Sequence, residues 1–134
     1  ISCSIVDNRV DNIMEWMQAS DAGLVLSKGS EAISRTLLEY MAAGLPVIAT
    51  TVGQIPEIIE DAGITIPHSS IADTRNALNS ILNNTALRSK LSQKALERAS
   101  TMTSRHFAQS TALFYEAVKK KGSLNIDFRC PYKV

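Results

Sequence analysis

The sequence contains few of the residues that form metal sites and disulfides. It has two cysteines and two histidines among 134 residues. Cys3 and Cys130 stand near opposite ends of the chain without a Cys-x-x-Cys spacing, and His68 and His106 are isolated from each other. This pattern excludes a zinc finger and a disulfide framework, and it favours a reducing, cytoplasmic setting. We expect both histidines to lie at the surface or at helix caps.

Long apolar runs and a strong charge of one sign are also absent. No stretch approaches the roughly 20 apolar residues that span a bilayer, and the N-terminus lacks the layout of a signal peptide. Residues 119–134 contain five basic residues and one acidic residue, which leaves nine basic against twelve acidic residues in 1–118. A mildly acidic body argues against a nucleic-acid partner. We expect 119–134 to be a basic irregular tail that aids solubility, with peripheral contact to an anionic membrane face as the alternative.

Apolar runs of strand length alternate with segments of helical length, which predicts an α/β fold with a parallel sheet. The run LPVIAT has no polar alternation, as expected for a strand that is buried on both faces. The chain opens on Ile1 within such a run, so we expect it to be part of a longer protein. The predicted strands are 1–6, 22–27, 45–50 and 62–67.

Helical spacing of apolar residues predicts helices at 10–20, 35–43 and 56–60, with Trp16 in the core or at an interface. Either Ser34 or Thr36 can cap the second of these helices, and Gly44 and Pro46 end it. After residue 70 helices follow one another without strands. The apolar stripes of these helices are predicted to cover the sheet. The three stripes consist of Leu78, Ile81 and Leu82; of Leu87, Leu91 and Ala95; and of Phe107, Thr111, Phe114 and Val118.

Two carboxylates flank the start of the helix at 35–43. Glu31 falls in the loop after a predicted strand, at the sheet edge where open α/β folds bind ligands. Glu39 points away from the apolar face of the helix, and the free amides of a helix start suit a phosphate or diphosphate. The alternative is a capping box, in which Glu39 reaches back to the backbone of Thr36 and binds no ligand. The spacing alone leaves both interpretations open.

Residues 27–67 combine the E-x7-E spacing of Glu31 and Glu39 with the segments EYMAAGLPVIAT and VGQIPEII. In this combination they resemble the C-terminal domain of retaining glycosyltransferases of the GT-B fold, family 4 (glycosyl transferases group 1). The resemblance implies a Rossmann-like parallel sheet flanked by helices, here with extra C-terminal helices. It makes residues 1–118 a partial nucleotide-sugar-binding domain, and it implies an N-terminal lobe as the missing partner.

The resemblance also implies roles for individual residues. Glu31 would contact hydroxyls of the donor sugar, Glu39 would bind the ribose, and no residue other than Glu31 is a candidate for catalysis. The donor would be a UDP-, GDP- or ADP-sugar, and neither a metal nor another cofactor is implied, which fits the absence of an Asp-x-Asp motif. The sugar and diphosphate would be held mainly by backbone groups of Ala32, Ile33, Ser34, Arg35, Thr36 and Leu37.

The implied reaction transfers a sugar, with retention, to a hydroxyl of a sugar or lipid-linked acceptor, in polysaccharide, lipopolysaccharide or glycolipid synthesis. The isolated chain is expected to be inactive, because the cleft needs both lobes to orient the reactants.

Three positions depart from the pattern of the resembled family, which usually has glycines where this chain has Ala32, Ser34 and Gln54. The basic residues that usually neutralise the donor diphosphate have no match in the chain, so Arg35 either replaces them in part or is an ordinary solvated side chain. An inactive nucleotide-binding or assembly module therefore stays an alternative, as does a GT-B sugar-nucleotide epimerase.

Overall fold

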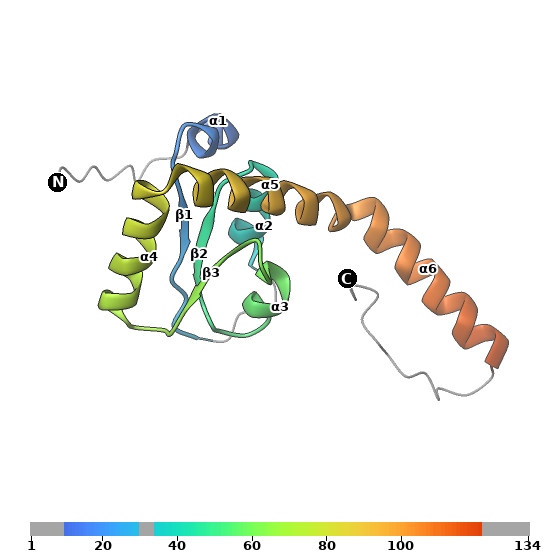
Figure 1. Ribbon diagram of the computed structural model, residues 1–134. Coiled ribbons are helices and arrows are strands. Elements are labelled where there is room, and N and C mark those ends of the chain that lie inside the picture. Colours follow the sequence, from blue (N-terminus) through green and yellow to red (C-terminus); the bar gives the residue numbers. More distant parts are fainter. Residues whose placement is uncertain (1–9, 30–33, 122–134) are drawn as a thin grey trace. The chain divides into compact units, whose positions relative to one another are not determined.

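The computed structural model describes residues 10–29 and 34–121, and the chain divides into two compact units, residues 1–99 and 100–134. The first unit holds a parallel sheet and the helices that follow its strands (Figure 1). The strand predicted at 1–6 lies outside the described residues. The predicted domain boundary after residue 118 stays a prediction.

Three of the predicted apolar runs form the sheet. The strands β1 (Gly23–Val25), β2 (Val47–Thr50) and β3 (Gly63–Ile66) pair in parallel in the order β1-β2-β3. Leu24 lies opposite Ile48, which in turn lies opposite Ile64. All four residues of β2 are buried, because both of its faces are covered, and this explains its lack of polar alternation. The predicted Rossmann-like parallel sheet is confirmed, with strands shorter than the apolar runs.

Helices cover both faces of this sheet. The helices α2 (Arg35–Ala42) and α3 (Ile55–Ile59) pack on one face, and α4 (Ile71–Asn83) packs on the other (Figure 1). Alternate residues of β2 serve the two cores, since successive side chains of a strand point to opposite faces. The core under α2 and α3 contains Val25, Leu37, Met41, Val47, Ala49, Ile55, Ile59, Ala62 and Ala95. The core under α4 contains Ile48, Ile66, Ala77, Ile81 and Leu91.

The end of α2 follows the sequence signals. Gly44 has a φ of 73°, a left-handed conformation that glycine adopts without steric cost. Its N–H donates to the carbonyl of Met41, and the N–H of Leu45 donates to the carbonyl of Tyr40. These bonds satisfy carbonyls that the helix end leaves free. Pro46 then prevents further helix, so the chain turns directly into β2.

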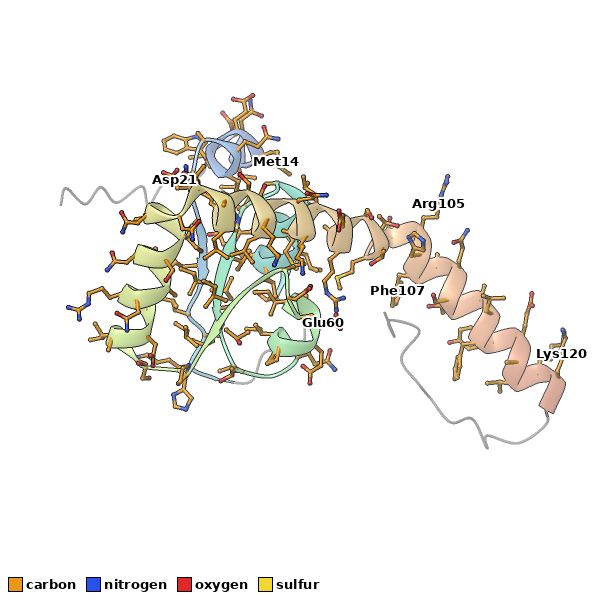
Figure 2. The ribbon with its side chains drawn as sticks, viewed as in Figure 1. Met14, Asp21, Glu60, Arg105, Phe107 and Lys120 are labelled. Atoms are coloured by element: carbon orange, nitrogen blue, oxygen red, sulfur yellow. The ribbon has the colours of Figure 1, made fainter. Side chains whose placement is uncertain are left out.

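The helix α5 (Thr85–Thr101) ties together the amino ends of the three strands. Its Leu91 and Ala95 are buried in the two cores. Four of its polar side chains contact the turns that precede the strands, and two of the contacted carboxylates, Asp21 and Glu60, are labelled in Figure 2. The contacts join Arg88 Nη1 to Asp21 Oδ1 (3.1 Å), Ser92 Oγ to Gly44 O (2.6 Å), Lys94 Nζ to Asp61 Oδ2, and Arg98 Nη1 to Glu60 Oε2 (2.9 Å).

The short helix α1 (Ile13–Gln18) buries one of its side chains, Met17. Trp16 is 55% exposed, and Ile13 and Met14 are exposed beside it. The prediction that Trp16 lies in the core is therefore wrong for the part of the chain that the structure describes. Its alternative, a place at an interface, stays a prediction.

The helix α6 (Ser104–Lys121) belongs to the second unit. Thr103 Oγ1 accepts a hydrogen bond from the backbone N–H of His106 at 3.3 Å, so Thr103 caps the helix. His106 lies in the first turn and is exposed, which confirms the prediction that it lies at the surface. The helix includes 119–121, the start of the predicted tail, and 122–134 lie outside the described residues. The prediction that its apolar stripe covers the sheet stays untested. Among the helices in the described ranges, none is long and apolar enough to cross a membrane.

Candidate functional site

The loops that follow the strands lie along one edge of the sheet. In a parallel sheet with helical connections, every strand ends at this edge and the next helix begins there. Thus α2, α3 and α4 all start at the edge where open α/β sheets bind their ligands. His68 lies in the loop after β3, and it is exposed as predicted. The start of α2 is the part of this edge where the sequence predicts donor binding.

Ser34 caps the start of α2. Its Oγ accepts a hydrogen bond from the N–H of Leu37 at 3.4 Å, and α2 begins at the next residue, Arg35. Ser34 is buried, whereas Thr36 is exposed within the first turn. The capping-box alternative required Thr36 to be the N-cap residue of the helix. Because the N-cap residue is Ser34, that alternative is wrong. The first N–H groups of a helix have no acceptor within the helix. Ser34 already accepts the N–H of Leu37, so the N–H groups of Arg35 and Thr36 can bind the oxygen of a ligand.

Glu39 faces solvent and has one weak partner among the described residues. Its side chain is 44% exposed, and its Oε1 lies 3.7 Å from Nη2 of Arg35, one turn earlier. The Arg35 side chain is 89% exposed. Exposed pairs at this spacing contribute only about 0.3–0.5 kcal/mol, so a ligand hydroxyl or phosphate can replace either partner at little cost. The prediction that Glu39 points away from the core is confirmed.

Thr50 connects the end of β2 to the loop that leads to the site. Its Oγ1 donates a hydrogen bond to the carbonyl of Ser27 at 2.7 Å, and Thr50 itself is buried. The loop after β1 is therefore held against the neighbouring strand just before the predicted sugar-binding segment. Sequence reasoning missed this role of Thr50. The available signal was a hydroxyl residue at the end of an otherwise apolar run.

The turn between β2 and α3 shows why one departure from the glycine pattern is tolerated. Gly53 has a φ of 57°, the left-handed region that glycine occupies without strain. Gln54, which stands where the resembled family usually has a second glycine, has a φ of −91°. Any L-residue adopts that value, so glutamine causes no backbone strain at this position.

Three of the predicted site residues, Glu31, Ala32 and Ile33, lie outside the described residues. Their roles, and the effect of having alanine at position 32, stay predictions. Within the described ranges, no group of three or more His, Cys, Asp or Glu side chains is arranged to hold a metal ion. Metal independence itself stays a prediction. Arg35, Thr36, Leu37 and Glu39 do lie together on α2, as the sequence predicts.

Residues 3–84, more than half of the chain, match the protein family described as glycosyl transferases group 1. Over 50 residues, 37% of this chain, the sequence is 48% identical to the N-acetyl-alpha-D-glucosaminyl L-malate synthase of Bacillus anthracis. That match spans 13% of the relative, so the chain corresponds to a small part of that protein's length.

Solved structures share the same arrangement of strands and helices. The C-terminal domain of a group 1 glycosyl transferase from Francisella tularensis is 28% identical with a TM-score of 0.63, over 74% of this chain and 51% of that domain. An Anabaena protein in complex with UDP-glucose has a TM-score of 0.71 at 23% identity, over 77% of this chain and 29% of that protein, which shows the fold alone. The sheet and its flanking helices are thus part of a GT-B domain. The match over residues 3–84, which includes the E-x7-E segment at the start of α2, shows that this chain belongs to the glycosyl transferases group 1.

Proposed function

We propose that the chain is part of the donor-binding domain of a retaining glycosyltransferase. The donor is a UDP-, GDP- or ADP-sugar, and the acceptor is a hydroxyl of a sugar or of a lipid-linked sugar. The reaction breaks the bond between C1 of the sugar and the diphosphate and joins C1 to the acceptor oxygen, and the nucleoside diphosphate leaves with the proton of the acceptor hydroxyl. One observation carries the proposal: Glu39 stands exposed on α2, just beyond the first-turn amides at the ligand-binding edge of the sheet.

Each described residue has a physical part in donor binding. The amides of Arg35 and Thr36, at the positive end of the α2 dipole, attract the diphosphate. Glu39 accepts hydrogen bonds from the ribose hydroxyls, and bonds of this charge-assisted kind contribute about 1.5–3 kcal/mol each. Arg35 leaves Glu39 when the donor arrives and pairs with a phosphate oxygen instead. Glu31 binds the sugar hydroxyls.

The relatives support this choice of substrate class. The Bacillus anthracis relative is named for the formation of an N-acetylglucosaminyl product, and the Anabaena structure holds UDP-glucose. The proposal that the reaction retains the configuration at C1 of the sugar rests on the E-x7-E segment at Glu31 and Glu39 and on the resemblance of that segment to retaining glycosyltransferases. The full protein acts in the cytoplasm without a metal, at the inner face of a membrane when the acceptor is lipid-linked. It uses an N-terminal lobe that completes the cleft, so the chain alone is inactive.

Nuclear magnetic resonance titration of the chain tests the proposal, because it detects binding even at millimolar affinity. UDP-glucose, GDP-mannose and ADP-glucose are added in turn while the amide signals of Arg35 and Thr36 are followed. We expect one donor to shift these signals. We expect Glu39→Gln to weaken the binding of that donor by about tenfold or more, because the substitution removes one charge-assisted hydrogen bond.

The matched control is Glu116→Gln, which removes an exposed helical carboxylate on α6 and should leave donor binding unchanged. The proposal fails if none of the three donors moves the α2 amides. It also fails if Glu39→Gln and Glu116→Gln have the same effect on affinity.

A further inference from the structure

A groove of about 680 Å³ opens at the carboxyl edge of the sheet, between the end of β1 and α4. The helix α4 begins at this edge and runs back along the sheet (Figure 1). Residues of its first two turns therefore line the end of the groove at the edge, and Leu78 and Leu82 line the part that lies further away. The groove lies on the face of the sheet opposite to α2, so it is separate from the amides of Arg35 and Thr36.

Two basic side chains line this groove, and no carboxylate of a described residue does. The two are Lys28, which follows β1, and Arg75, in the second turn of α4, and both are exposed. Neither forms an ion pair with a described residue, whereas four other basic residues of the same unit each pair with a carboxylate. The groove therefore has an excess of positive charge.

The acidic residue nearest to Arg75 in the sequence does not neutralise the groove. It is Asp73, whose Oδ2 accepts a hydrogen bond from Ser70 Oγ at 2.5 Å. Asp73 lines a second pocket together with Asn76 and Ser80, on a different face of α4. The positive charge of Arg75 is thus available to a ligand in the groove.

The loop that carries Lys28 also leads to the predicted sugar contact. The carbonyl of Ser27, one residue before Lys28, accepts the hydrogen bond from Thr50 Oγ1, and Thr50 also lines the groove. Lys28 precedes Glu31 by three residues, so covalent geometry keeps their Cα atoms within about 10 Å of each other. A molecule bound at Lys28 can therefore extend to the sugar of the donor, where the acceptor hydroxyl must be placed.

The charge of the groove fits a phosphate monoester better than a carboxylate. A phosphate monoester carries a charge of about −1.5 to −2 at pH 7, which two cations balance, whereas a carboxylate carries a single charge. An arginine binds phosphate through two parallel N–H···O bonds, and a lysine adds a mobile point charge beside it. The hydroxyls of Ser69 and Thr74 line the same end of the groove and can bind hydroxyls of a sugar.

We propose that Lys28 and Arg75 form an anion subsite that binds the phosphate of a phosphorylated sugar acceptor. The phosphate lies between the two side chains, and the sugar extends from it toward the donor. The role of this ligand as acceptor rests on the proposed function. The binding of its phosphate does not, so either proposal can fail without the other.

Nuclear magnetic resonance titration of the chain at pH 7 tests the subsite. Inorganic phosphate, D-glucose 6-phosphate and D-glucose are added in turn while the amide signals of Ser69, Thr74 and Arg75 are followed. We expect both phosphates to shift these signals and glucose to leave them unchanged. D-glucose 6-phosphate should bind at least about threefold more tightly than inorganic phosphate, because its sugar adds hydrogen bonds.

Three glutamine variants locate the phosphate. Lys28→Gln and Arg75→Gln should each weaken the binding of D-glucose 6-phosphate by about tenfold, because each removes a charge-assisted hydrogen bond. Lys90→Gln is the matched control, since Lys90 is an exposed cation of α5 outside the groove, and it should leave the affinity unchanged. All three variants should keep the melting temperature of the unchanged protein, because the three side chains are exposed.

Saturation with a nucleotide-sugar separates the subsite from the donor site. The donor used is the one that shifts the amides of Arg35 and Thr36. We expect it to change the affinity for D-glucose 6-phosphate by less than about twofold, because donor and acceptor must bind together. If no donor shifts the α2 amides, the proposed function fails, and the variants still show whether the subsite binds phosphate.

Three results would overturn the proposal. The first is that D-glucose 6-phosphate leaves the amides of the groove unchanged, or binds no more tightly than inorganic phosphate, because the groove would then hold a free ion only. The second is an equal loss of affinity in Lys90→Gln and Lys28→Gln. The third is a loss of affinity of about tenfold or more on saturation with the donor, because the phosphate would then occupy the donor site.

Discussion

Thr50 and Ser27 are 23 residues apart in the sequence, and they are joined by a hydrogen bond of 2.7 Å from Thr50 Oγ1 to the Ser27 carbonyl. This bond fixes the loop after β1 to the end of β2. The loop leads toward Glu31, the predicted sugar contact. The position of the proposed donor site therefore depends on a buried hydroxyl in the neighbouring strand as well as on the helix that carries Glu39.

Replacing Thr50 by valine should destabilise the protein with little change in volume. The substitution removes the hydroxyl that Ser27 accepts from, and a buried hydrogen bond of this kind contributes about 1 kcal/mol to the free energy of unfolding. Urea unfolding followed by circular dichroism measures the loss. Thr51→Val is the control, because Thr51 is exposed and the same chemical change there should cost less than about 0.5 kcal/mol. Equal costs at the two positions would contradict the role of Thr50.

Replacing Ser34 by alanine should lower the free energy of unfolding by about 1 kcal/mol, the usual cost of losing a helix N-cap. Ser34 Oγ accepts the N–H of Leu37, and alanine offers no acceptor. Thr36→Ala is the comparison, since Thr36 is exposed in the first turn and alanine has the higher helix propensity. It should be neutral or slightly stabilising. A larger loss at Thr36 than at Ser34 would mean that Thr36 is the cap in solution.

The parallel sheet could be predicted because its signals are local. Continuous apolar runs identified β1, β2 and β3, and Gly44 with Pro46 marked the end of α2. The three strands are shorter than the apolar runs that predicted them. A strand extends only as far as its hydrogen bonds to a neighbouring strand, and an apolar run can continue beyond that point. The prediction that Trp16 lies in the core was wrong for a different reason. A helical stripe shows which residues share a face, but it does not show whether another element covers that face.

The candidate site could be predicted only in part. The solvent-facing position of Glu39 followed from helical periodicity. The sequence also limited the N-cap residue of α2 to two candidates, both of which carry a hydroxyl. Sequence could not choose between Ser34 and Thr36, because both side chains can accept the same kind of bond. The contact between Thr50 and Ser27 could not be predicted from the hydroxyl at the end of an apolar run alone, since it depends on which strands are neighbours. The roles of Glu31, Ala32 and Ile33 stay predictions.

Replacing Gly63 by alanine should destabilise β3. A Cβ at this position would overlap Cδ1 of Ile59 and would lie 2.6 Å from the carbonyl oxygen of Val47, which is backbone and cannot move aside. Overpacking of this kind costs typically about 1–3 kcal/mol. Gly29→Ala is the control, because nothing lies within 4 Å of its Cβ position. Thermal unfolding should show a lower melting temperature for the first variant alone, and equal melting temperatures would contradict the close approach.

The ion pair between Asp61 and Lys94 should make stability depend on pH in the acid range. The hydrogen bond from Lys94, supported by its positive charge, lowers the pKa of Asp61 from its ordinary value of 3.8. A carboxyl whose pKa is lower in the folded state stabilises the protein above the unfolded-state pKa, and it loses that contribution as the pH falls through the folded-state pKa. The contribution of Asp61 is therefore complete at pH 7, declines below about pH 4 and disappears at lower pH.

Urea unfolding of Asp61→Asn and of the unchanged protein, at pH 7 and near pH 3, measures this dependence. The variant should be less stable than the unchanged protein at pH 7, and the difference should shrink at the lower pH. Lys94→Met provides the control, because it removes the largest cause of the lowered pKa of Asp61 and leaves only the smaller effects of a backbone hydrogen bond and of Arg98. Adding Asp61→Asn to Lys94→Met should then produce a smaller pH-dependent change than Asp61→Asn alone. A difference of constant size at both pH values would show that Asp61 acts through packing, and it would remove the ion pair as the cause.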